Sequence, residues 1–204
     1  MKIIEPSVTL INPPDYQTLL RTIEQAGRVC YKSEDKITED SAEQFVRNII
    51  KRGHEAVIEH ATITVKFICD RGVTHEIVRH RIASYCQEST RYCNYANDKF
   101  GNEITVIRPC YMEPDSAIYH IWERALKTAE IAYLDMMENG ATAQEARALL
   151  PNSVKTELVM TANIREWRHF LKLRTSPAAH PQMRQVANML LQLLQSEYPV
   201  LFWK

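Results

Sequence analysis

The sequence predicts a mixed α+β protein that folds as one domain over residues 1–204. Residues 61–69 and 153–162 alternate apolar with polar side chains, which is the pattern of a strand that buries one face. Other segments repeat apolar residues at intervals of three and four, as helices do when one side packs against a core. A chain of 204 residues is long enough to bury such a core. We therefore expect a sheet with helices packed against it.

The first quarter of the chain predicts one strand and two helices. The strand is expected at an edge of the sheet because two prolines follow it. In each helix the apolar residues recur at helical spacing and so define one buried face. The expected bounds are residues 2–11 for the strand, Asp15 to about Cys30 for the first helix, and Thr38 as N-cap to Gly53 for the second.

The segment His54–His60 carries two histidines and two glutamates, which raises the question of a metal site. Two histidines on one face of a helix stand four residues apart in metalloproteases, whereas these stand six apart. We therefore interpret the segment as a polar turn or capped helix start that contacts a ligand. The β-branched, alternating residues 61–69 that follow are expected to form a central strand.

The rest of the chain predicts a mixture of helices and strands. Gly72 is expected to end the central strand, and a helix is expected from Thr74 to Arg81. Thr142 followed by Glu145 has the spacing of a capping box, which indicates a helix start. The remaining expected elements are a strand at Ile104–Ile107, helices at Asp115–Glu138 and Thr142–Leu150, a strand at Ser153–Ala162, a polar-rich helix at Asn163–Arg174 and a last helix at Pro181–Glu197.

Composition excludes several classes of protein. The formal net charge is zero, which argues against a general nucleic-acid scaffold and makes any basic cluster a local site. Five cysteines without a C-x-x-C pair favour a reducing compartment. No apolar run has the length of a membrane span, and the N-terminus lacks the order of a signal peptide. We therefore expect a soluble, cytoplasmic protein that binds neither nucleic acid nor membrane.

The stretch from Arg79 to Arg91 contains three arginines, a histidine, two serines and a glutamine. Arginine presents a planar fork of donors that matches phosphate oxygens, serine adds hydroxyl groups, and glutamine can read the amide edge of a nucleobase. The five glycines form neither a G-x-G-x-x-G nor a Walker loop, so a bound nucleotide must be held by side chains. As one helix the stretch would extend about 18 Å, too far for one small ligand. We therefore expect a short helix that runs into a loop and serves two ligands or two subunits.

Written as Arg79-His80-Arg81-x-x-Ser84-x-x-x-x-Ser89-x-Arg91, this stretch resembles the signature of the flavin-dependent thymidylate synthase (ThyX) family, RHRxxSxxxxSxR, at every fixed position. The resemblance extends from His54 to His180 and Gln182 and so covers most of the chain. It implies reductive methylation of dUMP to dTMP, with methylenetetrahydrofolate as carbon donor, NADPH as reductant and FAD as cofactor, and release of tetrahydrofolate. It also implies a homotetramer with FAD and dUMP sites shared between subunits, built on an antiparallel sheet flanked by helices.

The resemblance implies roles for individual residues. Arg174 is implied as the catalytic residue, because a guanidinium at N3 and O4 of uracil stabilises the negative charge that activates C5. Arg91 and Arg147, with Ser89, are implied at the phosphate. The full set implied at dUMP is Glu76, Arg79, Gln87, Glu88, Ser89, Thr90, Arg91, Arg147 and Arg174. The set implied at FAD is Ala56, Glu59, Arg79, His80, Arg81, Gln87, Asn163, Arg165 and His169, and no residue is expected to bind a metal.

Three positions depart from residues that some members carry: Ala56 replaces a hydroxyl residue, Gln87 a glutamate and His169 an asparagine. We expect these changes to affect individual hydrogen bonds and not the chemistry. Cys86 lies inside the motif, and we interpret it as a small half-buried residue rather than a nucleophile. Two other classes remain open: a module that binds RNA or a nucleotide without turnover, and an oxidoreductase that only shares the flavin site. The neutral charge and the few aromatic residues near the motif disfavour the first.

Overall fold

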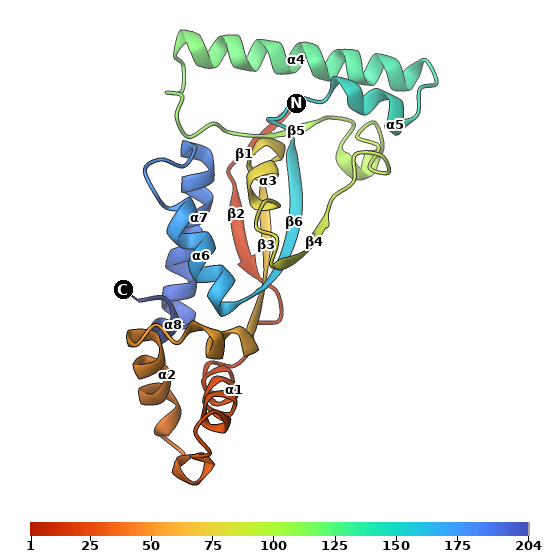
Figure 1. The fold of residues 1–204 in the computed structure, drawn as a ribbon. Coiled ribbons are helices and arrows are strands. Elements are labelled where there is room, and N and C mark those ends of the chain that lie inside the picture. The colour runs from red at the N-terminus through yellow and green to blue at the C-terminus, as the bar shows by residue number, and fades with distance from the viewer. Residues whose placement is uncertain (204) are drawn as a thin grey trace. The chain divides into compact units, whose positions relative to one another are not determined.

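A computed structural model describes residues 1–203 of the chain (Figure 1). The protein divides into two compact units, each assembled from segments that are far apart in the sequence. Unit 1 comprises Met1–Ser7, Phe67–Arg79 and Cys86–Leu158. Unit 2 comprises Val8–Lys66, His80–Tyr85 and the chain from Val159 onward. One domain over residues 1–204 stays a prediction.

The main sheet is antiparallel and has four strands in the order β2-β3-β6-β4. The strands are β2 (Ser7–Leu10), β3 (Thr62–Asp70), β4 (Ala83–Gln87) and β6 (Lys155–Asn163). Along β3 and β6 every second side chain is buried, which confirms the alternation predicted from the sequence. Both strands occupy inner positions, so the central place expected for residues 61–69 is confirmed. The predicted fold class is likewise confirmed.

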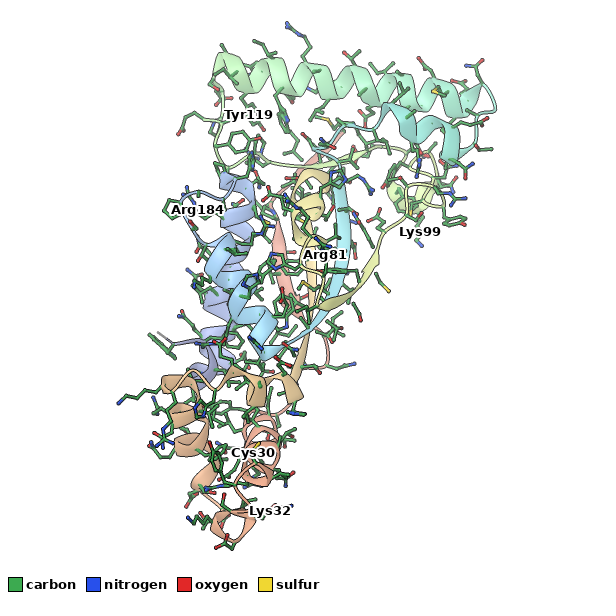
Figure 2. The ribbon with its side chains drawn as sticks, in the orientation of Figure 1. Cys30, Lys32, Arg81, Lys99, Tyr119 and Arg184 are labelled. Carbon is green, nitrogen blue, oxygen red and sulfur yellow. The ribbon has the colours of Figure 1, made fainter. Side chains whose placement is uncertain are left out.

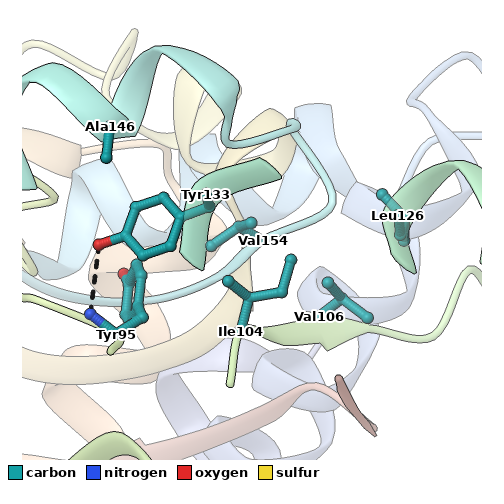
Figure 3. Packing of buried hydrophobic residues seen from close by; sticks show 7 residues of the cluster. All are labelled: Tyr95, Ile104, Val106, Leu126, Tyr133, Ala146 and Val154. Atoms are coloured by element: carbon teal, nitrogen blue, oxygen red, sulfur yellow. Dashed lines mark hydrogen bonds between the residues drawn. The ribbon is translucent and has the colours of Figure 1, made fainter. Parts of the chain in front are cut away.

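Unit 1 has a core of its own, to which helix α4 contributes. Helix α4 (Ala117–Glu138) lies beside the short helix α5 (Ala143–Ala146), which continues into the 3-10 turn η4 (Arg147–Leu149). Strands β1 (Lys2–Ile4) and β5 (Thr105–Ile107) pair in parallel, and unit 1 also contains α3 (Arg71–Ile77) and the 3-10 turn η3 (Asp98–Phe100). The hydroxyl of Tyr133 accepts a hydrogen bond from the backbone N–H of Tyr95 at 3.3 Å (Figure 3). The buried residues packed there are Tyr95, Ile104, Val106, Leu126, Tyr133, Ala146 and Val154.

Unit 2 consists of two helical pairs and the strand segments next to them. Helices α1 (Tyr16–Val29) and α2 (Ser41–Lys51) pack together, and α6 (Ile164–Arg174) packs on α7 (Pro181–Glu197) (Figure 1). The shorter elements are the 3-10 turns η1 (Glu34–Lys36) and η2 (Glu55–His60) and the terminal helix α8 (Pro199–Phe202). Gly53 and Gly140 have φ values of 72° and 88°, which suit glycine just past a helix end, as expected. Within residues 1–203, no helix is long and apolar enough to span a membrane.

Most element boundaries agree with the sequence prediction, and the capping box of Thr142 with Glu145 is confirmed. Three predictions were wrong at the ends of elements. Residues 2–11 form two strands rather than one, because Pro6 lacks the N–H that would continue a ladder. Helix α2 begins at Ser41 after Asp40, not after Thr38, whose backbone N–H donates to the Ser41 hydroxyl. The predicted helix Thr142–Leu150 is α helix only to Ala146 and then tightens into η4.

The region around the motif also differs from its prediction. Gly72 does not end the central strand: β3 ends at Asp70, which caps α3 by accepting a hydrogen bond from the backbone N–H of Val73 at 2.7 Å. Helix α3 therefore covers Arg71–Ile77 rather than Thr74–Arg81. The middle of the motif, Ala83–Gln87, is strand β4 and not a loop, with exposure that alternates along it. Cys86 on β4 is exposed, so the expectation that it is half-buried was wrong.

Gly27 on α1 is a close-packing position that predicts a stability effect. A Cβ there would lie 2.6 Å from Cζ of Phe45 and 2.9 Å from Cγ1 of Val57. Alanine gains about 1 kcal/mol in a helix over glycine, but overpacking costs about 1–3 kcal/mol, so Gly27→Ala should destabilise the protein by about 1 kcal/mol. Urea unfolding measures the change, with the exposed Gln25→Ala on the same helix as control. A more stable Gly27→Ala protein would contradict this packing.

Candidate active site

Three side chains of unit 2 form a hydrogen-bonded chain centred on His80. Nδ1 of His80 lies 2.9 Å from Oε1 of Glu166, and Nε of Arg174 donates to Nε2 of His80 at 3.0 Å. Glu166 lies in the first turn of α6 and Arg174 is the last residue of the helix. Asn163 caps α6 by accepting a hydrogen bond from the backbone N–H of Glu166. The two ends of one helix therefore bind the same imidazole.

The surroundings of His80 favour its neutral form. Only 5 % of His80 and 7 % of Glu166 are exposed. Burial lowers the pKa of His80, with Arg174 and His169 acting in the same direction and Glu166 acting against it. Tyr85 on β4 donates its hydroxyl to the backbone carbonyl of His80, and burial next to Glu166 raises the pKa of Tyr85 to about 12. The ring thus lies among groups that hold its position and its charge state.

The same cluster could also be interpreted as a metal site, but the contacts of His80 favour a hydrogen-bond network. His80, Glu166 and His169 offer ligand atoms that all lie within 4.8 Å of one another. Both ring nitrogens of His80, however, already take part in hydrogen bonds. The guanidinium of Arg174 next to the ring would also repel a metal cation. We interpret the cluster as a hydrogen-bond network, and the absence of a metal stays a prediction.

A groove of about 910 Å³ lies along α6 within unit 2. Its volume falls in the range of ligand pockets, which is about 300–1,000 Å³. Arg165 of α6 donates from Nη1 to Glu59 of η2 at 2.6 Å, and its Nε lies 3.6 Å from Glu55. His169 and Asn163 line the groove as well. Several residues predicted to hold FAD therefore lie around one groove.

The groove balances its charges. Glu55, Glu59 and Glu166 face Arg165, Arg168 and Lys172, so three carboxylates oppose three cations. Nε of Arg168 is buried and has no hydrogen-bond partner within residues 1–203, although Glu55 lies 3.9 Å away. A buried donor of this kind is costly unless something pairs with it. Glu55 is therefore the nearest acceptor to this buried nitrogen, and the guanidinium of Arg168 is also held by a hydrogen bond from Nη1 to the carbonyl of Leu201.

A second cavity of about 480 Å³ adjoins the same elements of unit 2. It is lined by Ala56 and His54, and it shares Glu55 and Arg165 with the larger groove. Ala56 was predicted at FAD, and the structure places it in this cavity and not in the larger one. Glu55–His60 form the 3-10 turn η2 without a side-chain cap at His54, so the segment is a turn rather than a capped helix start, and its contact with a ligand stays a prediction.

In unit 1, Glu88 is the centre of a second polar cluster. Its carboxylate accepts from the Tyr95 hydroxyl at 2.9 Å and from Nζ of Lys155 at 2.9 Å. Lys155 also donates to Glu157 at 2.8 Å. Gln87, the preceding residue, donates from Nε2 to the hydroxyls of Thr74 and Thr156, at 3.0 and 3.3 Å. These bonds use the amide N–H donors, so a ligand at Gln87 would meet its amide oxygen.

The arginines predicted at the phosphate also gather in unit 1. Nε of Arg91 donates to Oε1 of Gln144 on α5 at 2.9 Å, and Arg147 follows three residues later. The hydroxyl of Ser89 accepts from the backbone N–H of Arg91 at 3.3 Å. Arg91 and Arg147 are both exposed. Unit 1 thus holds two exposed arginines and a serine around one helical turn.

The predicted residues separate between the two units. Glu76, Arg79, Gln87, Glu88, Ser89, Thr90, Arg91 and Arg147 belong to unit 1, and of these Thr90 is buried. Ala56, Glu59, His80, Arg81, Asn163, Arg165, His169 and Arg174 belong to unit 2. Arg81, labelled in Figure 2, is exposed, whereas His80 is buried. Asn163 caps a helix in addition to lining the groove.

Sequence reasoning missed several residues that the structure brings to these sites. In unit 2 they are Glu166, Arg168 and Lys172, and in unit 1 Gln144 and Lys155. Glu166 is separated from His80 by 86 positions, so no local pattern could pair them. Helical spacing could have placed Arg168 and Lys172 on one face with Arg165, since they lie at intervals of three and four.

The fold and these residues define an α+β protein with clustered arginines, a groove of about 910 Å³ and no glycine-rich loop. Residues 15–200 match the sequence model of the family described as "Thymidylate synthase complementing protein". The chain belongs to the flavin-dependent thymidylate synthase family.

Similar proteins support this placement. The flavin-dependent thymidylate synthase of Pyrococcus furiosus is 33% identical over 96% of this chain and 83% of its own length. That of Mycobacterium tuberculosis is 33% identical over 88% of this chain and 77% of its own length. The crystal structure of the UMP/dUMP methylase PolB from Streptomyces cacaoi, bound with 5-Br dUMP, is 23% identical, with a TM-score of 0.78 over 99% of this chain and 95% of its own. This likeness supports the fold, and the predicted family and enzyme class are confirmed.

Proposed function

We propose that the protein converts dUMP to dTMP by reductive methylation. In this reaction a methylene group would pass from methylenetetrahydrofolate to C5 of dUMP; FAD, when bound and reduced by NADPH, would supply the hydride that completes the methyl group, and tetrahydrofolate would be released. The observation that carries the proposal is the complete Arg79–Arg91 motif within a family match over residues 15–200. The two polar sites described above have the chemistry that this reaction needs.

The larger groove of unit 2 fits a flavin nucleotide. Its volume of about 910 Å³ suits a large cofactor, and its cations suit a pyrophosphate. Arg165 and Arg168 are the groove cations that would hold the phosphates. Glu59 would keep Arg165 oriented through their ion pair. Asn163 and His169 would add polar contacts at the groove wall.

Arg174 is proposed to activate the pyrimidine. Carbon C5 of uracil becomes nucleophilic only when negative charge develops on N3 and O4 of the ring. A guanidinium held at that edge stabilises the charge in the transition state more than in the ground state. Arg174 is half-buried and its Nε is bonded to His80, so its guanidinium enters the reaction in a fixed orientation.

Arg91, Arg147 and Ser89 are proposed to bind the phosphate of dUMP. The guanidinium fork forms two parallel bonds to phosphate oxygens, and the serine hydroxyl adds a third donor. Gln144 bonds to Nε of Arg91, which leaves the phosphate contact to the terminal nitrogens. Glu88 and Gln87 are proposed beside the nucleotide, together with Glu76, Arg79 and Thr90.

Arg91→Lys should weaken dUMP binding. Lysine keeps the charge but loses the bidentate grip and the bond to Gln144, so the loss should be about 1–3 kcal/mol, or roughly 5- to 150-fold in Kd. Calorimetric titration of the flavin-loaded protein with dUMP measures it. Arg124→Lys on the exposed face of α4 is the matched control. Unchanged affinity in Arg91→Lys would place the phosphate elsewhere.

One reaction mixture tests the proposed function. Protein incubated with FAD should show flavin absorption after removal of free cofactor. With NADPH, dUMP and methylenetetrahydrofolate it should form dTMP and release tetrahydrofolate. Release of dihydrofolate instead would contradict the reductive chemistry, and a protein that never binds flavin would overturn the proposal.

We also propose that the protein acts as a homotetramer with sites completed by neighbouring subunits, as the motif resemblance implies. The proposed phosphate site lies in unit 1 and the proposed flavin groove lies in unit 2. Light scattering coupled to size-exclusion chromatography gives the mass directly. A monomer that is fully active would contradict shared sites. The cytoplasmic location, and the absence of nucleic-acid and membrane partners, stay predictions.

A further inference from the structure

The bonds of His80 fix which ring nitrogen carries the proton. Arginine has only donors, so Nε2 of His80 must accept the bond from Nε of Arg174. In a neutral imidazole the proton then sits on Nδ1, which donates to the carboxylate of Glu166. Protonation of Nε2 would break the bond to Arg174 and set two cations side by side. The network is therefore intact only when His80 is neutral.

The same bonds fix the direction of the Arg174 guanidinium. The group is planar, so holding its Nε–H toward one acceptor also sets the plane of the terminal nitrogens. The acceptor is itself held: the ring of His80 lies 4.8 Å from that of Phe170 and 5.7 Å from that of His169. Glu166 is held in turn by the Asn163 cap on its backbone. Each member of the chain thus constrains the next.

We propose that Glu166 and His80 are positioning residues for Arg174: Glu166 holds His80 as the Nδ1–H tautomer, and Nε2 of His80 orients the guanidinium of Arg174. His80 is thereby given a role other than direct flavin contact. The inference rests on the proposed function, because it concerns the arginine assigned to the pyrimidine. It predicts that a change at Glu166, although this residue also lines the larger groove, lowers kcat while dUMP affinity and flavin occupancy change little.

The test is Glu166→Gln in the flavin-loaded protein. The amide keeps the size of the side chain but not the charge that favours the Nδ1–H form. We expect kcat to fall by about 10- to 100-fold, the cost of misplacing a catalytic group, while dUMP affinity and flavin absorption stay close to those of the wild type. The matched control is Glu24→Gln, which alters another buried carboxylate of unit 2, paired with Arg28 and Ser41.

The pH profile separates positioning from a structural role. We expect kcat to fall at low pH as His80 becomes protonated. The titratable or charged groups around His80 are Glu166, His169 and Arg174 of α6 and Tyr85 of β4. The carboxylate of Glu166 raises the pKa of His80, so its removal should move the acid limb of kcat to lower pH. A limb that belongs to the dUMP phosphate, which titrates near pH 6, would not move. Glu24→Gln should lower stability and leave the limb in place.

Nitrogen-15 NMR of labelled histidine tests the geometry without turnover. The His80 signal is assigned as the one present in the wild-type protein and absent from His80→Gln. At neutral pH we expect this signal to be that of an imidazole protonated at Nδ1 only. An Nε2–H tautomer or a charged ring would overturn the inference. So would a Glu166→Gln protein whose kcat matches the wild type at every pH while the wild type makes dTMP. A wild-type protein that binds flavin and makes no dTMP would instead overturn the proposed function.

Discussion

Arg174→Ala is expected to lower the rate of dTMP formation by about 10²–10³ while the protein still binds flavin. Removing one preorganised donor at a developing negative charge lowers kcat by about 10²–10³, and Arg174 is the cation assigned to that charge. The flavin groove does not depend on it, because the cations that line the groove are Arg165, Arg168 and Lys172. Single-turnover formation of dTMP, followed by chromatography, gives the rate. Flavin absorption after gel filtration gives the occupancy.

Two further variants locate the effect of Arg174. Arg174→Lys keeps the positive charge but lacks the planar group that bonds to His80, so it should recover only a small part of the rate. Arg184→Ala on α7 removes a half-buried arginine of the same unit that has no assigned role, and it should retain the wild-type rate. If Arg174→Ala loses flavin, the residue belongs to the cofactor. If it keeps the full rate, another group activates the pyrimidine.

The sequence predicted the long elements of the fold because their signals are local. In β3 and β6 the alternation of buried side chains follows directly from the two-residue period of a strand. Helix α7 was predicted at its observed bounds, since Pro181 favours a first helical position. The wrong predictions concern segments whose secondary structure depends on residues that are near in space but distant in the sequence. Strand β4 has no β-branched residue, so its sequence predicts a loop, but the structure shows an edge strand next to β6.

The candidate site was predicted in its residue types and not in its connections. Clustered arginines at positions 79, 81 and 91 identify an anion site from the sequence, because a solvated helix would mix charges of both signs. The role of His80 did not follow from its position beside two arginines. Its partners Glu166 and Arg174 are 86 and 94 residues away, and only folding brings them to one ring. The same holds for Arg91 and Gln144, which are 53 residues apart.

Trp167→Ala is expected to give the largest loss of stability among these variants. Trp167 is fully buried on α6, its ring packs edge-on against Phe170 with centroids 5.6 Å apart, and its Nε1–H donates to the carbonyl of Ile63 at 3.0 Å. Replacing a buried tryptophan by alanine costs about 3–5 kcal/mol, and the unpaired carbonyl adds to this cost. Urea unfolding followed by far-ultraviolet circular dichroism measures it. Trp203→Ala, at an exposed tryptophan, should change stability by less than about 0.5 kcal/mol.

Trp167→Phe separates the packing of this residue from its hydrogen bond. Phenylalanine keeps most of the apolar contact with Phe170 but cannot donate to Ile63, so the loss should fall to about 1–3 kcal/mol, the cost of an unsatisfied buried acceptor together with a small cavity. Because Glu166 and His169 lie within two residues of Trp167 on α6, a shift of the helix would also disturb His80. A Trp167→Phe protein that retains the wild-type kcat would show that this bond secures the fold and not the position of Arg174. Equal stability losses in both variants would contradict the packing role.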